Sequence, residues 1–187
     1  MAVRLLRCAV EQIVDWHANL FVEAHVVAFV AVAGQYSPSP ALFDIECANI
    51  GSRWLGKAGE FRLEISWHRD TAEKAARLRA TMQSGPLVEL ASVALALILA
   101  RRVVALGPID VTDYGARVDY RARKRKMVLE ISGTEVPAEL GRRHRQKVAQ
   151  ARDNPFGWDA YVVVSAFSAN GHRVRFSKNR VEDSRHG

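Results

Sequence analysis

The stretch "RVDYRARKRKMVLEISGTE", residues 117–135, places one acidic residue in each of two alternating apolar segments, with five basic residues between them. The alternation predicts an antiparallel pair of strands, at roughly 115–122 and 126–133. An even-numbered loop would put Asp119 directly opposite Glu130. Opposed side chains share a face, with Cβ atoms about 4.5–5.5 Å apart, so the two carboxylates could hold one hard cation such as Mg²⁺.

The other face of this hairpin is predicted to point into a core. Its residues are Val118, Tyr120, Met127, Leu129 and Ile131. The acidic face has two interpretations, because opposed like charges without a partner destabilise a sheet. One is a metal site. The other is an exposed face on which Arg117 and Arg121 neutralise Asp119, and the sequence leaves both open.

Alternation and helical spacing predict the remaining elements. Strands are expected at 25–34, 41–50, 60–67, 160–168 and 172–178, and helices at about 71–83, 87–105 and 137–152. Asp70 and Glu73 have the spacing of a capping box, and Pro137 suits the first turn of a helix. Residues 1–24 give no choice between helix and strand.

These elements predict a mixed α/β (α+β) fold with a central sheet flanked by helices. An N-terminal antiparallel β-meander in residues 1–69 is expected to pack on an α/β core in residues 70–187, as a separate region or as part of one continuous domain. The chain has 187 residues, of which 49% are hydrophobic, enough for a substantial core.

The longest apolar run, residues 90–100, is shorter than the roughly 20 residues that a membrane span needs, and the N-terminus lacks the pattern of a signal peptide. We therefore expect a cytoplasmic protein without a membrane partner. Cys8 and Cys47 are too few for a disulfide framework, and the histidines show no zinc-ligand spacing.

The positive charge is concentrated in the C-terminal part of the chain. Residues 1–106 hold 11 Lys and Arg against 10 Asp and Glu, whereas residues 107–187 hold 16 against 10. A concentrated basic patch suits a polyanion such as a nucleic acid, although many such patches are only solvated surfaces. The predicted nucleic-acid contacts are Lys124, Arg125, Arg142, Arg143 and Arg145. On the helix that carries three of them, His144 is expected to pack inward, and Phe156 and Trp158 beyond it either stack on bases or pin a loop to the core.

Residues 87–168 resemble the core of the PD-(D/E)xK nuclease superfamily, which has restriction-endonuclease-like architecture. The likeness lies in the order helix, hairpin with Asp and then Glu-x-Lys, helix, strand, and in the residues of "RVDY" and "LEISGT". It implies Asp119 and Glu130 as catalytic residues and Mg²⁺ ligands, with the Ile131 carbonyl as a third ligand. Ser132 stands in place of the motif's lysine.

Some members of the superfamily recruit a basic residue from the following helix, and Lys147 is the candidate for that role here. Alternatively, Lys147 is a solvated lysine of the helix or contacts a phosphate. Glu89 could be the additional acid that some members carry. If no basic residue reaches the acids, the fold would bind nucleic acid without cleaving it, because a neutral serine cannot replace a positive charge in the transition state.

Three functions follow from these observations. The first is a metal-dependent nuclease or other phosphodiesterase, with DNA favoured over RNA. The second is a catalytically inactive nucleic-acid-binding protein or subunit of a larger complex. The third is a structural or assembly protein whose N-terminal sheet, through Phe61, Leu63, Trp67 and Trp54, packs against another subunit or a second copy of the chain.

Overall fold

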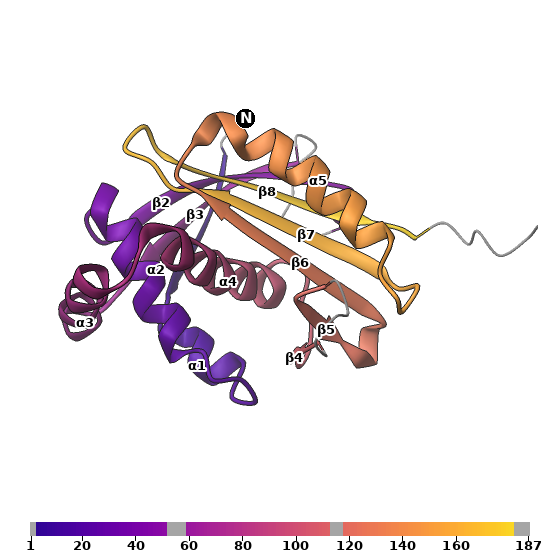
Figure 1. The fold of residues 1–187 in the computed structure, drawn as a ribbon, viewed down its shortest axis with the longest axis horizontal. Helices are drawn as coiled ribbons and strands as arrows, with labels where there is room; N and C mark the ends of the chain where they lie inside the picture. Colours follow the sequence, from indigo (N-terminus) through magenta and orange to yellow (C-terminus); the bar gives the residue numbers. More distant parts are fainter. Residues whose placement is uncertain (1–2, 52–58, 113–117, 182–187) are drawn as a thin grey trace, which may run out of the picture.

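An eight-stranded mixed sheet with helices on both faces forms the protein (Figure 1). The structure, a computed structural model, describes residues 3–51, 59–112 and 118–181. Within these residues the predicted mixed α/β fold is confirmed, and the strand order is β1-β3-β2-β8-β7-β6-β5-β4. The strands are β1 (Arg4–Ala9), β2 (Ala41–Ala48), β3 (Glu60–Ser66), β4 (Asp110–Val111), β5 (Tyr120–Ala122), β6 (Met127–Thr134), β7 (Asp159–Ala166) and β8 (His172–Asn179). The helices are α1 (Gln12–Trp16), α2 (Glu23–Tyr36), α3 (Arg69–Thr81), α4 (Ser84–Arg102) and α5 (Leu140–Arg152), with 3-10 turns η1 (Arg123–Arg125) and η2 (Pro137–Glu139).

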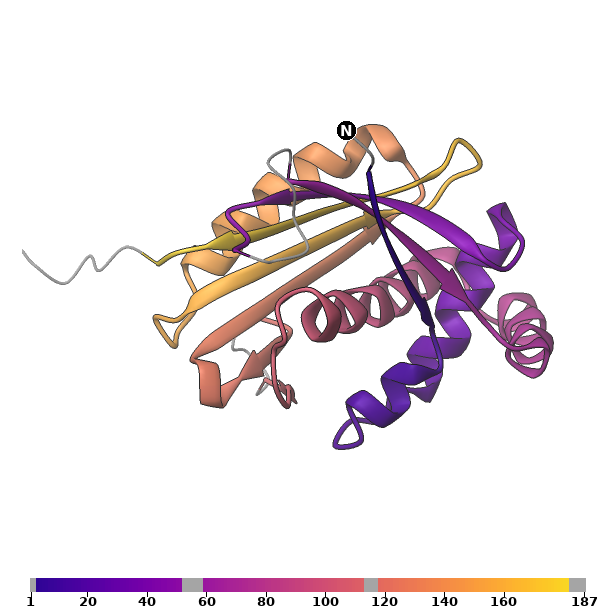
Figure 2. The ribbon, with the colours of Figure 1, turned by 180° about the vertical axis from the view of Figure 1, so that it is seen from behind.

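The helices divide unequally between the two faces of the sheet. Figures 1 and 2 show α2, α3 and α4 on one face and α5 alone on the other. Strands β2 and β8 pair in parallel, so the N-terminal and C-terminal parts of the chain share one sheet. Strands β6 and β7 are also parallel, and α5 is the connection between them. This connection places the basic helix α5 directly beside β6.

Helix α4 forms the centre of the larger core. Among the described residues it is the one helix long and apolar enough to span a membrane by length and composition, but most of it is buried inside the protein. It packs on α2 and on β6. A buried core helix accounts for this composition equally well.

The predicted strand at 25–34 is wrong, because this segment lies within helix α2. Its apolar residues form a continuous run rather than an alternation, and such a run does not distinguish a buried strand from a buried helix. Packing against both α3 and α4 decides in favour of the helix. The undecided N-terminal segment contains strand β1, which pairs in parallel with β3, and the short helix α1.

Helix α3 is confirmed, but its predicted capping box is wrong. The helix begins at Arg69, so Asp70 lies inside the first turn and makes no side-chain cap. A distant residue holds this end of the helix instead: the Glu11 carboxylate accepts hydrogen bonds from the His68 amide (2.9 Å) and the Thr71 hydroxyl (2.6 Å). The observed break between α3 and α4 is short, because α3 ends at Thr81 and α4 already begins at Ser84.

The predicted register of the β5–β6 hairpin is confirmed. Tyr120 pairs with Leu129 and Ala122 with Met127 across a four-residue loop. This register aligns Asp119 with Glu130. Asp119 lies just before β5, where the ladder ends, and its carboxylate accepts a hydrogen bond from the Ile131 amide (2.7 Å).

One interpretation of the sequence was an exposed acidic face neutralised by arginines. The β6 side of the hairpin is instead buried. Every residue of β6 is buried, and Glu130 is 0% exposed. Val118, predicted to share a face with Tyr120, packs instead in the smaller core beneath α5 together with Val128. Arg121 lies over the Phe156 ring, and Arg117 falls outside the described residues.

Candidate active site at the edge of strand β6

The candidate site lies where β6 extends beyond its short neighbour β5. In the described part of the chain, β5 pairs with β6 only as far as Leu129, which leaves one edge of residues 130–134 without a strand partner. Three elements bring charged side chains to this edge: Glu89 from α4, Lys147 from α5 and Asp119 from the turn before β5. Their mutual electrostatic interactions join them to Glu130 as one cluster.

Glu130 and Lys147 form the centre of this cluster. The Lys147 ammonium donates a hydrogen bond to Glu130 Oε2 at 2.8 Å, and the Lys147 side chain is 21% exposed. The other carboxylate oxygen, Glu130 Oε1, is buried and has no hydrogen-bond partner among the described residues. Burial, followed by the negative charge of Asp119, raises the pKa of Glu130 to about 7, although Lys147 opposes this shift.

The other two carboxyl groups are also held in an environment that disfavours their charge. Burial raises the pKa of Asp119, against the lowering effects of Lys147 and of the hydrogen bond from the Ile131 amide. Partial burial likewise raises the pKa of Glu89, whose side chain is still 54% exposed, and Asp119 adds to the increase. Carboxyl groups with raised pKa values gathered around one lysine make this edge a candidate functional site.

Lys147 is not the free surface lysine of the alternative interpretation. Burial alone would lower its pKa, but the hydrogen bond with Glu130 and the charges of Asp119, Glu130 and Glu89 outweigh burial and raise it. The ammonium group is therefore positively charged at neutral pH. Its helix, α5, is the one that follows the β5–β6 hairpin.

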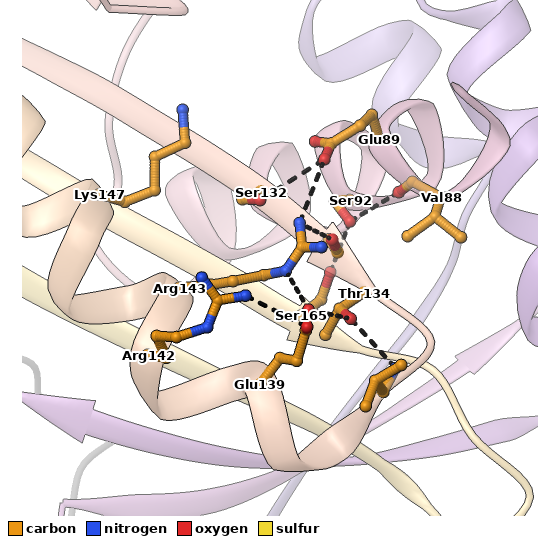
Figure 3. Close-up of polar contacts among 12 residues, drawn as sticks. Val88, Glu89, Ser92, Ser132, Thr134, Glu139, Arg142, Arg143, Lys147 and Ser165 are labelled. Carbon is orange, nitrogen blue, oxygen red and sulfur yellow. Dashed lines mark hydrogen bonds and ion pairs between the residues drawn. The ribbon is translucent and has the colours of Figure 1, made fainter. Parts of the chain in front are cut away.

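Ser132 and Arg143 complete the site (Figure 3). The Ser132 hydroxyl donates to Glu89 at 3.5 Å, and Arg143 lies 4.0 Å from the same carboxylate. Arg143 also donates to Glu139 (2.8 Å) and to the Gly133 carbonyl (3.0 Å), which fix its position. Figure 3 shows Glu89, Ser132 and Arg143 pointing toward one another, with Lys147 projecting from α5 beside them.

The predicted nucleic-acid contacts separate into two groups. Arg142 and Arg143 are tied to Glu139, at 3.1 and 2.8 Å. Lys124, Arg125 and Arg145 are exposed, and no ion pair with another described residue holds them. The second group is therefore the one available to phosphates.

Residues near α5 with a predicted packing role are found in that role. His144 bonds through Nε2 to the Ser177 hydroxyl at 2.9 Å, in keeping with the prediction that it packs inward. The rings of Phe156 and Trp158 lie 5.1 Å apart and pack on the smaller core. These two aromatic residues pin the loop after α5, which was one of their two predicted roles.

The described side chains that were predicted to face a partner from the N-terminal sheet pack within this chain. Phe61 and Leu63 are 3% and 0% exposed and belong to the larger core of this chain. Trp67 packs edge-on against Phe29. Trp54 falls outside the described residues.

The oxygen atoms that this edge offers to a hard cation are two carboxylates and a carbonyl group. Among the described residues, no three His, Cys, Asp or Glu side chains are grouped closely enough to hold a metal ion. Mg²⁺ commonly takes only one or two carboxylates, with water and substrate phosphate as its remaining ligands. Asp119 and the partnerless Glu130 Oε1 could supply these carboxylates. The Ile131 carbonyl could add a third oxygen, because it lies on the same side of β6 as the Ile131 amide that binds Asp119.

Two hollows adjoin the site, one on each side of Glu89. The first, of about 250 Å³, is lined by Asp119, Ile131 and residues of α2, α4 and β5. The second, of about 480 Å³, is lined by Gly85, Arg143 and the end of β6. His25 of α2 lines the first hollow, and sequence reasoning missed it because a lone histidine in a segment read as a strand gives no signal.

Comparisons of the chain with models of known protein families, with curated proteins and with solved structures find no match.

Proposed function

We propose that the protein is a metal-dependent phosphodiesterase that cleaves nucleic acid, with DNA as the favoured substrate. Asp119 and Glu130 would hold Mg²⁺, and Lys147 would replace the lysine that the motif lacks at Ser132. One observation carries the proposal. The Lys147 ammonium lies 2.8 Å from Glu130 and interacts electrostatically with Asp119 and Glu89, so a positive charge reaches both predicted metal ligands.

The order of elements supports the same conclusion. Helix α4, the β5–β6 hairpin, helix α5 and strand β7 follow one another as the resemblance to the PD-(D/E)xK superfamily implies. Asp119 and Glu130 occupy the two hairpin positions of that pattern. Lys147 comes from α5, the element from which some members of the superfamily draw their basic residue.

Each side chain has a definable role in hydrolysis of a phosphodiester. Mg²⁺ bound to the carboxylates would supply a Lewis acid and a more acidic water molecule. The Lys147 ammonium would stabilise the negative charge that develops on the phosphate, in a buried site where such a charge pair is stronger than in water. Glu89 and Arg143 would orient the substrate at the open edge of β6, since both line the adjoining hollows.

A catalytically inactive subunit that binds nucleic acid is the second candidate. It is favoured by Ser132, which provides no charge, and by the ion pair in which Lys147 already neutralises Glu130. The two proposed functions differ in whether they need a metal ion. Only the phosphodiesterase needs Asp119 as a metal ligand.

Cleavage of labelled DNA and RNA, single-stranded and duplex, tests the proposal. We expect cleavage with Mg²⁺ or Mn²⁺ and none in EDTA. Asp119→Asn and Glu130→Gln should each lower the rate by at least about 10²-fold, because both remove a charged ligand of the metal. The matched control, Asp44→Asn, alters an exposed carboxylate on the opposite half of the sheet and should cleave like the unmodified protein.

Two results would contradict the proposal. One is the absence of cleavage of all four substrates with either metal, and the other is unchanged cleavage by Asp119→Asn. Calorimetric titration with Mg²⁺ gives an independent readout, in which the Asp119 and Glu130 variants should lose the heat of binding while Asp44→Asn retains it.

The role assigned to Lys147 has its own test. Lys147→Ala should lower the rate by about 10²–10³-fold, in the range that loss of one charge-stabilising group costs. Adding Ser132→Lys to that variant restores an ammonium beside Glu130 and should recover at least tenfold of the loss. Lys74→Ala, an exposed position on α3, is the control. If the double variant stays as slow as Lys147→Ala while binding substrate normally, the positive charge is not what the reaction needs.

A further inference from the structure

The hollow of about 250 Å³ beside the carboxylates has walls of a distinctive kind. Leu90, Val93, Val111 and Tyr120 give it largely apolar sides, whereas Asp119 and Glu89 of the candidate site supply its carboxyl groups. Sites for drug-sized ligands usually have about 300–1,000 Å³, so this one suits a smaller group.

His25 supplies the polar group of this pocket away from the carboxylates. It lies in the first turn of α2 and is half-buried. Its Nδ1 atom is buried and has no hydrogen-bond partner among the described residues. Burial lowers the pKa of His25, although the backbone carbonyls of Phe21 and Val22 act in the opposite direction. The imidazole is therefore neutral at pH 7. Because Nδ1 is enclosed, Nε2 is the nitrogen left to bond a group in the pocket.

An exposed aromatic residue lies four positions before His25. Phe21 is 79% exposed, the most exposed of the large hydrophobic residues described. Its loop is held against the segment that leads into β4, because the Asn19 side chain donates to the Ile109 carbonyl at 2.6 Å. Val111 of β4 lines the pocket together with His25, so this attachment brings the Phe21 loop near the pocket.

We propose that this pocket is a subsite for one unpaired nucleobase, next to the phosphate that the carboxylates act on. The base would lie between the apolar walls, with its polar edge bonded to His25 and with Phe21 stacking at the entrance. The position beside a scissile phosphate rests on the proposed phosphodiesterase function. The fit of a base to the pocket does not rest on that function. A nucleobase has flat apolar faces and a polar edge, which the apolar walls and the His25 imidazole complement.

The subsite makes single-stranded or unpaired nucleic acid the preferred substrate class. In a duplex, each base has its polar edge paired and its faces stacked on its neighbours, so it cannot enter the pocket without being flipped out. A pocket for a single base, connected to the site through Asp119, therefore favours strand ends, loops and single strands.

Binding in EDTA tests the subsite without cleavage. The probes are a 12-nucleotide DNA strand containing 2-aminopurine, a blunt duplex of the same sequence and the same strand with an abasic site in place of 2-aminopurine. We expect the strand to bind at least tenfold more tightly than the duplex, with quenching of 2-aminopurine fluorescence. His25→Ala and Phe21→Ala should each weaken strand binding about tenfold, within the range that loss of one stacked base produces, and should leave duplex binding unchanged.

Matched controls lie far from the pocket. His68→Ala removes a histidine side chain that is 74% exposed, and Leu42→Ala removes an exposed apolar residue of β2. Phe21→Ala also guards against misfolding of the His25 variant, because truncation of so exposed a side chain leaves the core intact.

The outcomes separate this inference from the function on which it rests. Equal binding of strand and duplex, or unchanged strand binding by His25→Ala and Phe21→Ala, would overturn the subsite even if the protein cleaves DNA. Equal binding of the intact and abasic strands would also overturn it. Strand binding that depends on His25 without any metal-dependent cleavage would support base recognition here and refute the phosphodiesterase.

Discussion

At the scale of single residues, the protein keeps charged and titratable groups in places where burial disfavours their charge. Glu130 is fully buried and compensated by one lysine, which leaves one of its oxygen atoms without a partner. Such an arrangement is costly for stability, which is the physical ground on which we propose a functional role for this residue. The sequence placed this residue correctly, because its alignment with Asp119 depends only on loop length and strand alternation.

His172 is a second buried titratable group, and its role is structural. It is 1% exposed, stacks on Phe43 with ring centroids 4.6 Å apart, and bonds through Nε2 to the Ser37 hydroxyl at 3.1 Å. Burial lowers its pKa from 6.5 to about 4. The folded state therefore takes up this proton only near pH 4, whereas the unfolded state takes it up near 6.5.

The consequence is a loss of stability in acid. The contribution of His172 to the free energy of unfolding is fully present above about pH 6.5 and is lost as the pH falls toward 4, by roughly 3 kcal/mol in total. His172→Phe keeps the stacked ring but cannot be protonated, so its stability should fall less between pH 7 and pH 5. Urea unfolding at the two pH values measures this. His68→Phe, at an exposed position, should behave like the unmodified protein, and equal losses for His172→Phe and the unmodified protein would contradict the prediction.

At the scale of elements, local sequence patterns predicted strands β5, β6, β7 and β8, apart from their exact ends. They failed for α2, because a continuous apolar run fits a buried helix and a buried strand equally. They also failed for the start of α3, which Glu11, far away in the chain, holds through the His68 amide. Both errors have one cause: the deciding contacts join segments that are distant in sequence.

The contact between α4 and β6 depends on the absence of a side chain at Gly133. A Cβ atom there would contact Ser92 Oγ and would lie 2.7 Å from Val88 Cγ1 and 2.8 Å from the Val88 carbonyl oxygen. Ser92 cannot move away freely, because it bonds to the Val88 carbonyl and to Ser165 of β7 (Figure 3). The helix must therefore shift if the glycine is replaced.

Gly133→Ala should lower the free energy of unfolding by about 1–3 kcal/mol, as is usual for overpacking of a well-packed core. Because β6 carries Glu130, the same shift should weaken catalysis or metal binding. Urea unfolding provides the measurement. Gly107→Ala is the control, since a Cβ at that position meets no heavy atom within 4 Å and the change should stay within about 0.5 kcal/mol. Equal stability of the two variants would show that α4 and β6 tolerate a wider spacing.

At the scale of the whole molecule, the charges of the two halves of the sheet are arranged differently. On the half formed by β1, β3, β2 and β8, cross-strand ion pairs balance the charges, as between Arg62 and Asp44 at 3.0 Å. On the other half, the tip of the β5–β6 hairpin carries the exposed residues Lys124 and Arg125. The hairpin tip is therefore one place where positive charge is available to a polyanion, and α3 is another, through the exposed residues Lys74, Arg77 and Arg79.

This asymmetry predicts which lysines and arginines contact phosphates. The logarithm of the binding constant for duplex DNA should fall linearly with the logarithm of the salt concentration, and Lys124→Ala combined with Arg125→Ala should reduce the slope by about 2. Fluorescence anisotropy between 50 and 300 mM salt, concentrations on the order of those where phosphate contacts are lost, gives the slope. Arg69→Ala combined with Lys74→Ala on α3 removes the same charge elsewhere. Equal slopes for both double variants would mean that only net charge matters.

The sequence by itself determined the hairpin that carries Asp119 and Glu130, its register, and the basic character of the helix that follows. These features depend on side-chain alternation and loop length within about twenty residues, where few conformations compete. Only the tertiary structure decided that Lys147 reaches Glu130, that Glu89 joins them, and that His25 lines the adjoining pocket. Those positions depend on how α5, α4 and α2 pack across the sheet, and such long-range packing has no local signature in the chain.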